Sequence, residues 1–335
     1  MGQLVNGVWQ TQALSTIATG GKFVRTTAGF RNWITADGSP GPSGDGGFKA
    51  ESGRYHLYVS YACPWAHRTL IFRALKGLQD HITVSVVHPD MLNDGWTFDD
   101  SLAGATGDTL YGLPFLRDIY TRADPRVTTR ATVPILWDKE RETIVSNESS
   151  EIIRMFNSAF DGLTGDTADY WPRDLRADIE SVNERVYKTL NNGVYKSGFA
   201  QTQAHYDAAV IPLFDTLDWL EDRLSENRYL MGDRVTEADW RLFPTLARFD
   251  NVYHLHFKCN RRRIVDYPNL WAYTRELYQW PGVAATVNMD HIVRHYHYSH
   301  ETINPHRIVP INPVLDWDEP HGRGMQITAQ RHSGQ

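Results

Sequence analysis

Hydrophobic and polar positions in the first half of the chain predict strands and helices in alternation. Residues 55–60 alternate as in a β-strand, with Leu57 and Val59 on one face. Residues 64–78 carry apolar side chains at helical spacing and end near Lys76-Gly77, which predicts an α-helix. A strand over 82–87 completes a β-α-β unit. Two short strands over 130–137 and 144–146, and a capped helix over 148–156, extend it to a small mixed sheet layered with helices.

The second half has only helical periodicity. Apolar residues recur three or four positions apart over 175–190, 204–224, 237–252 and 270–278. Thr236 to Asp239 resembles a capping box with Asp in place of the usual Glu. We therefore expect an α/β domain followed by an all-α domain. The expected divisions are an irregular extension over 1–52, a sheet domain over 53–165, an all-helical domain over 170–300 and an irregular tail over 301–335.

Composition excludes several classes of protein. A chain of 335 residues is long enough for two domains, and 41% hydrophobic with 22% charged residues is ordinary for a folded protein. The net charge of −6 argues against sequence-independent binding to nucleic acid. No segment has the pattern of a signal peptide or a membrane span, so we expect a cytoplasmic protein without a membrane partner. Two cysteines exclude a disulfide framework and a four-cysteine zinc site.

Cys63 is the candidate nucleophile. It stands directly before Pro64, which suits the first turn of a helix, so the thiol is expected at a helix N-terminus where an anion is favoured. Such positions lower the pKa of a thiol below about 8.5. Ala66 occupies the place of the second thiol of a two-cysteine redox motif, which predicts release of a mixed disulfide by an external thiol. A buried, inert cysteine is the alternative at position 63, and it is our expectation for Cys259.

The order of these motifs resembles that of the thioredoxin-fold glutathione transferases that have a cysteine at the active position. Val133-Pro134 matches the place of that superfamily's cis-proline, where the preceding backbone pairs with the cysteinyl part of glutathione. Glu148-Ser149 matches the pair that receives the γ-glutamyl end, a carboxylate at a helix N-terminus. Thr236 to Asp239 matches the capping box of the helical domain.

Five further segments resemble the glutathionyl-hydroquinone reductases, or xi-class glutathione transferases. The resemblance covers about residues 55–313, and the N-terminal extension also fits. His297 stands where a second Tyr is expected after Tyr296, and Asn312 stands where Gly is usual. The matching segments are CPWAHRT over 63–69, GWTF over 95–98, NGVYK over 192–196, RFDNVY over 248–253 and SHETINP over 299–305.

The resemblance implies glutathione as co-substrate and S-glutathionylated aromatic quinols as substrates. The Cys63 thiolate would take the glutathionyl group, and a second glutathione would release it as oxidised glutathione. Tyr195 and Tyr296 would donate protons or stabilise phenolic oxygens, with Tyr253 as a third pocket phenol. Trp96 would cover glutathione and Arg130 would meet one of its carboxylates. From the residues alone, a core aromatic with a satisfied hydroxyl is the favoured interpretation of each tyrosine, whereas Arg130 could be a solvated loop residue and Trp96 a surface-capping aromatic.

Two other functions remain open at this stage. An omega-like thioltransferase or dehydroascorbate reductase would share Cys63 and need none of the three tyrosines. A non-catalytic glutathione-fold binding module would not depend on the thiol. We expect no metal site, since the histidines at 291, 295, 297 and 300 lack a completing carboxylate or thiol, and we expect a homodimer from the family.

Overall fold

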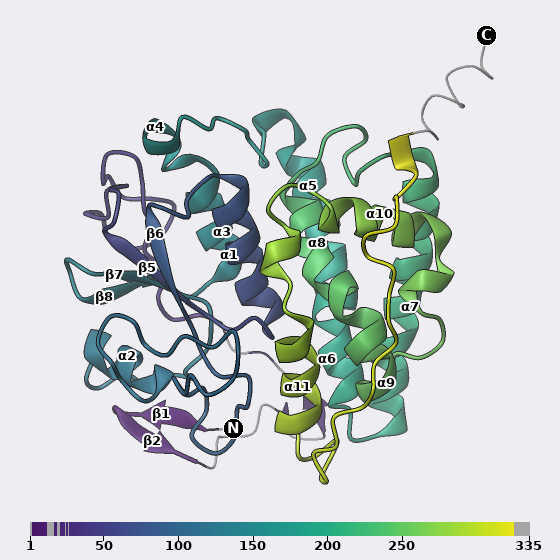
Figure 1. The fold of residues 1–335 in the computed structure, drawn as a ribbon, viewed down its shortest axis with the longest axis horizontal. Helices are drawn as coiled ribbons and strands as arrows, with labels where there is room; N and C mark the ends of the chain where they lie inside the picture. The colour runs from purple at the N-terminus through teal and green to yellow at the C-terminus, as the bar shows by residue number, and fades with distance from the viewer. Residues whose placement is uncertain (1, 12–16, 19–20, 24, 26, 325–335) are drawn as a thin grey trace. The chain divides into compact units, whose positions relative to one another are not determined.

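The computed structural model describes residues 2–11, 17–18, 21–23, 25 and 27–324, and the chain forms two compact units (Figure 1). One, here called the sheet unit, comprises Met1–Thr16, Arg25–Asp169 and Ala285–Val309. The other, the helical unit, comprises Ile17–Val24, Tyr170–Ala284 and Pro310–Gln335. Among the residues described, no helix combines the length and the apolar character needed to cross a membrane.

A four-stranded mixed sheet forms the core of the sheet unit. The strand order is β6-β5-β7-β8, with β5 parallel to β6 and antiparallel to β7. All residues of β5 are buried, as expected for a central strand covered on both faces. Helices α1 and α3 lie side by side (Figure 1). The elements are β5 (Tyr55–Val59), α1 (Pro64–Leu75), β6 (Ile82–Val86), α2 (Leu116–Ala123), β7 (Ile135–Asp138), β8 (Thr143–Ser146), α3 (Ser149–Ser158) and α4 (Asp161–Thr164).

The predicted strand over 130–137 is too long at its start, because β7 begins only at Ile135. Pro134 has no N–H to donate to a strand ladder, and the Val133–Pro134 peptide bond is cis, as the family resemblance implied. The helix predicted over 64–78 ends earlier, at Leu75, with Lys76 as its C-cap. Helix α2 lies between the predicted strands over 82–87 and 130–137, where the sequence pattern predicts no element.

The expectation of an irregular segment over 1–52 is wrong for residues 3–10, which form a hairpin of β1 (Gln3–Val5) and β2 (Val8–Gln10). Asn6 and Gly7 both have positive φ, at 49° and 77°, the geometry of a two-residue hairpin turn that Asn-Gly favours. Leu4 of this hairpin exchanges both backbone hydrogen bonds with Thr129. The hairpin is therefore anchored beside Arg130.

The helical unit contains the helices predicted from periodicity and further elements between them. A short pair of strands, β3 (Ile17–Ala18) and β4 (Lys22–Phe23), also belongs to it. The capping box at Thr236 and Asp239 is confirmed. The helices are η1 (Arg173–Leu175), α5 (Arg176–Val186), η2 (Tyr187–Asn191), α6 (Gly193–Gly198), α7 (Gln203–Glu226), α8 (Glu237–Arg248), η3 (Phe249–Tyr253), α9 (His254–His256), η4 (Ile264–Asp266) and α10 (Pro268–Tyr278).

The last helix does not follow the expected division of the chain. Residues 285–309, with α11 (Met289–Ser299), belong to the sheet unit, whereas the range 170–300 had placed most of them in the helical domain. The 3-10 turn η5 (Ala284–Thr286) precedes α11. Farther along the chain, Arg323 is buried in the helical unit, where its Nε forms an ion pair with Glu276 Oε2 at 2.9 Å. The expected irregular tail is thus anchored near its end, and residues 325–335 lie outside the described part.

Candidate functional site

Cys63 is the N-cap residue of α1, as the sequence predicted. Pro64 is the first helical residue, and the Cys63 carbonyl accepts the first helical hydrogen bond from the backbone N–H of His67 at 3.0 Å. The thiol is half-buried, so a substrate can reach it. Its Sγ therefore lies at a helix N-terminus, where unsatisfied N–H groups and the helix dipole favour a negative charge.

The Val133 carbonyl accepts a hydrogen bond from this thiol. The distance from Cys63 Sγ to Val133 O is 3.6 Å, within the range of a thiol hydrogen bond. A peptide-like ligand that pairs with the backbone at Val133 would thus hold its own sulfur close to Cys63. Pro134 follows in the cis conformation directly before β7. The structure brings together residues that lie far apart in the sequence.

The N-terminus of α3 is a second place where an anion could bind. Glu148 is its N-cap, and its carboxylate accepts hydrogen bonds from Ser150 N at 2.9 Å and Ser150 Oγ at 2.8 Å. Ser149 is the first helical residue and is buried. Free N–H groups in the first helical turn can receive a carboxylate. The predicted pair is thus at a helix start, with the Glu148 side chain already engaged in capping.

Positive charge gathers in the sheet unit around the entrance of α1. Arg25 and Arg68 both lie over the ring of Trp65, with Cζ 4.7 and 4.6 Å from the ring centroid. The pKa of Arg130 is lowered from its ordinary value, first by burial and then by repulsion from Arg25. A bound carboxylate would stabilise both guanidinium groups, because it would offset the repulsion between Arg25 and Arg130. Sequence reasoning selected Arg130 but missed Arg25, which has no motif to mark it.

Trp96 is buried within the sheet unit, with 6% of its surface exposed. Its ring stacks on that of His295 in α11, with centroids 4.8 Å apart and an interplanar angle of 21°. The alternative that Trp96 is a surface aromatic is therefore wrong. Only a small part of the indole surface is exposed and available to contact a ligand.

Two of the predicted tyrosines lie together in the helical unit. The ring centroids of Tyr195 and Tyr253 are 6.1 Å apart, and both rings pack on Phe257. Tyr195 follows the π-helical segment η2, and Tyr253 ends the π-helical segment η3. Such segments often occur at functional sites because they displace side chains from regular helical positions. Tyr296 is 1% exposed and lies on α11, which belongs to the sheet unit. That it shares a pocket with Tyr195 and Tyr253 stays a prediction.

Cys259 is a passive thiol, as expected. It is fully buried, and burial raises its pKa to about 12. The histidines at 291, 295, 297 and 300 are all buried. Within the described part of the chain, no group of three or more His, Cys, Asp or Glu side chains is arranged to hold a metal ion.

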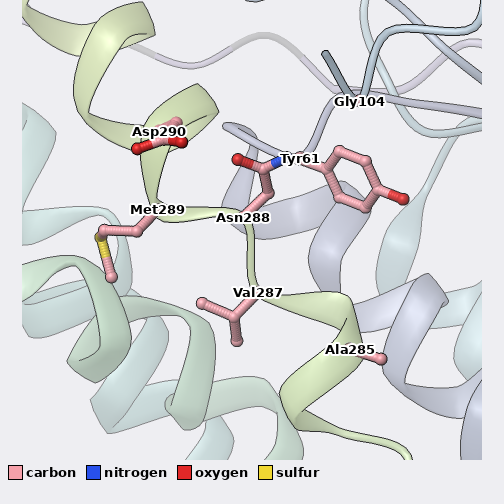
Figure 2. Close-up of a pocket in the computed structure, with 7 residues that line it drawn as sticks. All are labelled: Tyr61, Gly104, Ala285, Val287, Asn288, Met289 and Asp290. Atoms are coloured by element: carbon pink, nitrogen blue, oxygen red, sulfur yellow. The ribbon is translucent and has the colours of Figure 1, made fainter.

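A shallow cavity of about 410 Å³ opens beside the loop that leads to Cys63. Tyr61, Gly104, Ala285 and the stretch 287–290 line it, and Asn288 points toward Tyr61 (Figure 2). The ring of Tyr61 also packs edge-on against His291, with centroids 5.6 Å apart. All of these residues belong to the sheet unit. The start of α11 therefore lies close to the loop that carries the thiol.

Two family models match the chain. The model of the glutathione S-transferase N-terminal domain matches residues 62–159, and that of the glutathione S-transferase C-terminal domain matches residues 203–276. The first match includes Cys63, Trp96, Arg130, Val133 and Glu148, although it identifies no role for them. The second includes Tyr253 but neither Tyr195 nor Tyr296.

Several curated proteins and solved structures are similar over almost the whole chain. Glutathionyl-hydroquinone reductase YqjG of Escherichia coli is 59% identical, over 98% of this chain and 100% of the relative. Glutathionyl-hydroquinone reductase PcpF of Sphingobium chlorophenolicum is 52% identical, over 94% of this chain and 97% of the relative. The glutathione-bound structure of YqjG superimposes with a TM-score of 0.91 at 57% identity, over 97% of this chain and 100% of that one.

Proposed function

Since this chain belongs to the glutathionyl-hydroquinone reductases, a family within the glutathione S-transferases, we propose that it reduces S-glutathionyl-hydroquinones to hydroquinones at the expense of glutathione. The observation that carries the proposal is the position of Cys63 at the start of α1, with Sγ 3.6 Å from the Val133 carbonyl. The absence of a cysteine at position 66 supports a monothiol mechanism.

In the first step the Cys63 thiolate attacks the sulfur of the glutathionyl group. The new S–S bond forms as the sulfur–carbon bond of the quinol breaks, and the electron pair of that bond stays on the ring carbon. A proton added to this carbon gives the hydroquinone, so the ring is reduced while the Cys63 thiolate and the thioether sulfur are oxidised to a disulfide. A tyrosine hydroxyl suits the proton transfer, and Tyr195, Tyr253 and Tyr296 are our candidates for it.

In the second step another glutathione thiolate attacks the glutathionyl sulfur of the mixed disulfide. Oxidised glutathione leaves, and the electron pair of the broken S–S bond returns to Cys63 as a thiolate. The helix N-terminus favours this leaving thiolate, as it favours the attacking one in the first step. The same sulfur therefore acts as nucleophile and then as leaving group in one ping-pong cycle.

Glutathione binding is assigned to residues of the sheet unit. The Val133 backbone next to Pro134 would pair with the cysteinyl part, and the α3 N-terminus at Glu148 and Ser149 would receive the γ-glutamyl carboxylate. Trp96 would cover the tripeptide and Arg130 would meet a carboxylate. The repulsion between Arg130 and Arg25 supports an anion between or beside them, because a bound carboxylate would relieve it.

A homodimer and a cytoplasmic location complete the proposal. Glutathione transferases are usually dimers, and two cysteines without a disulfide suit a reducing compartment. Sedimentation of the purified protein at micromolar concentration would test the dimer, with a monomer as the contrary result.

Two measurements test the function. Purified protein and the Cys63→Ala variant are assayed with glutathione and either a glutathionyl-hydroquinone or a simple glutathione disulfide. We expect rapid reduction of the quinol conjugate, weak activity on the disulfide and loss of both activities in the variant. A strong preference for the disulfide would favour a thioltransferase. Full activity in the variant would overturn the catalytic proposal.

A further inference from the structure

Helix α11 holds the loop that carries Trp96. Three consecutive loop residues are each bound by a side chain of α11, all within the sheet unit. The loop is thus fixed at its start by direct hydrogen bonds and a two-point ion pair, which restrict where the following residues can lie. The bonds are His295 Nδ1 to Pro89 O at 2.7 Å, Arg294 to both carboxylate oxygens of Asp90 at 2.8 and 2.7 Å, and Met91 N to Ser299 Oγ at 3.0 Å.

His295 has two contacts with this loop. Because a carbonyl can only accept, Nδ1 of His295 carries the proton that it donates to Pro89. This bond fixes the plane of the imidazole, and the ring of Trp96 stacks on its face at 4.8 Å. Both side chains are buried, at 6% exposure each. The indole therefore packs on an imidazole that is itself held by the backbone.

The segment that ends in His295 also contacts the helix of the nucleophile. His67 of α1 is fully buried, and its Nε2 lies 2.8 Å from Thr286 Oγ1. In the first turn of α11, Nε2 of His291 donates to the Ala103 carbonyl at 2.9 Å, and the ring packs against Tyr61. Residues 286–295 therefore contact both the helix that begins at Cys63 and the loop that carries Trp96.

We propose that His295 is a positioning residue that sets the orientation of Trp96 over glutathione. This inference rests on the proposed function, because it needs Trp96 to contact the tripeptide. His295 acts through Trp96 and does not itself touch the reacting sulfur. The ring stack, more than the hydrogen bond to Pro89, transmits the effect, since it is the direct contact with the indole.

Two substitutions separate the contributions of the ring and of the donor. His295→Phe keeps a flat ring and loses the N–H, whereas His295→Asn keeps a donor near the position of Nδ1 and loses the ring. We expect His295→Asn to raise KM for glutathione about 2- to 10-fold, the range of one aromatic stack, with a smaller change in kcat. His295→Phe should stay within about 2-fold of the unchanged protein, which is rescue by the variant that preserves the stack.

Trp96→Ala and the double variant that combines it with His295→Asn distinguish failure of the inference from failure of the proposed function. Trp96→Ala should raise KM for glutathione, and adding His295→Asn to it should change KM no further. If Trp96→Ala leaves KM unchanged, the proposed contact with glutathione fails and the inference fails with it. Two outcomes would overturn only the inference. In one, Trp96→Ala raises KM but His295→Asn does not; in the other, His295→Asn raises KM by the same factor whether or not Trp96 is present.

A matched control excludes a general loss of stability. Tyr55→Phe removes a partly buried hydrogen bond of the same unit, from Tyr55 Oη to the Lys49 carbonyl at 2.7 Å. It should leave KM for glutathione unchanged, and an increase equal to that of His295→Asn would overturn the inference. If His295→Asn does not fold, His295→Leu replaces it with the same expectation, since leucine fills similar space without a flat ring.

Discussion

Asp239 is the buried carboxylate on which the start of α8 depends, and its removal should destabilise the helical unit. The side chain is fully buried. Oδ2 accepts hydrogen bonds from Thr236 N at 2.7 Å and Thr236 Oγ1 at 3.1 Å, and Oδ1 accepts from Leu230 N at 2.9 Å and Tyr273 Oη at 2.8 Å. One carboxylate thus ties the helix start to the preceding turn and to α10.

The size of the effect follows from these contacts. Asp239→Ala leaves the backbone N–H groups of Thr236 and Leu230 and the phenol of Tyr273 without their acceptor, each worth about 1–3 kcal/mol when buried. The fourth donor, the Thr236 hydroxyl, makes the longest of the four hydrogen bonds and adds less. Burial also raises the pKa of Asp239, so removing the carboxylate relieves part of its desolvation. We therefore expect Asp239→Ala to lower the free energy of unfolding by about 3 kcal/mol, the lower end of the summed range. Asp239→Asn keeps the shape of the side chain and one acceptor oxygen, but its NH2 group faces one of the former donors. The free energy of unfolding should therefore fall by about 1–3 kcal/mol.

Urea unfolding followed by far-ultraviolet circular dichroism measures both variants. Asp178→Ala is the matched control, because Asp178 lies in the first turn of α5 in the same unit but is exposed. Its loss should be about 0.3–1 kcal/mol, the usual interaction of a first-turn carboxylate with the helix dipole. A loss in Asp239→Ala no larger than in Asp178→Ala would refute the reasoning, as would an asparagine variant less stable than the alanine variant.

Three further predictions concern pH, chemistry and glutathione binding. Burial, followed by repulsion from Lys139 and Arg73, lowers the pKa of His56 from 6.5 to about 3. The folded protein therefore keeps His56 neutral, so the free energy of unfolding decreases as the pH falls below 6.5, the pKa of the unfolded chain. Between pH 7 and 5 the free energy of unfolding should fall by about 2 kcal/mol more than in His56→Asn, and a parallel pH profile in that variant would contradict this. Cys63→Ser should conjugate glutathione without forming a mixed disulfide, and mass spectrometric detection of glutathione on position 63 would exclude this expectation. Arg25→Gln should raise KM for glutathione about 2- to 5-fold at low salt and less at high salt, whereas Arg122→Gln at an exposed ion pair should not; equal effects would argue against a local role.

Elements whose signals are local in the chain could be predicted from the sequence. The strand 55–59, the helix that begins at Pro64 and the capping box at Thr236 each depend on residues a few positions apart, and each is present. The Asn6-Gly7 hairpin had an equally local signal, but the Gly-rich and Ser-rich composition of the extension obscured it. Strand β7 starts later than its periodicity predicted because Pro134 lacks a ladder donor.

The parts of the site that sequence reasoning missed depend on tertiary contacts. Arg25 lies in a segment without periodicity, and only its position over Trp65 and beside Arg130 gives it a candidate role. His295 was considered as part of a histidine cluster, whereas it stacks on Trp96. The grouping of α11 with the sheet unit likewise follows from contacts with residues 89–103, which helical spacing within α11 cannot indicate.

Catalysis by this protein depends on covalent transfer of glutathione to a single thiol, and peptide mapping by mass spectrometry tests this transfer directly. The protein is mixed with a glutathionyl-hydroquinone in the absence of added glutathione, quenched with acid and digested. We predict one glutathionyl group on the peptide that contains Cys63, none on that of Cys259, and release of the group as oxidised glutathione when glutathione is added. Formation of hydroquinone with Cys63 still unmodified in this single-turnover experiment would contradict the mechanism.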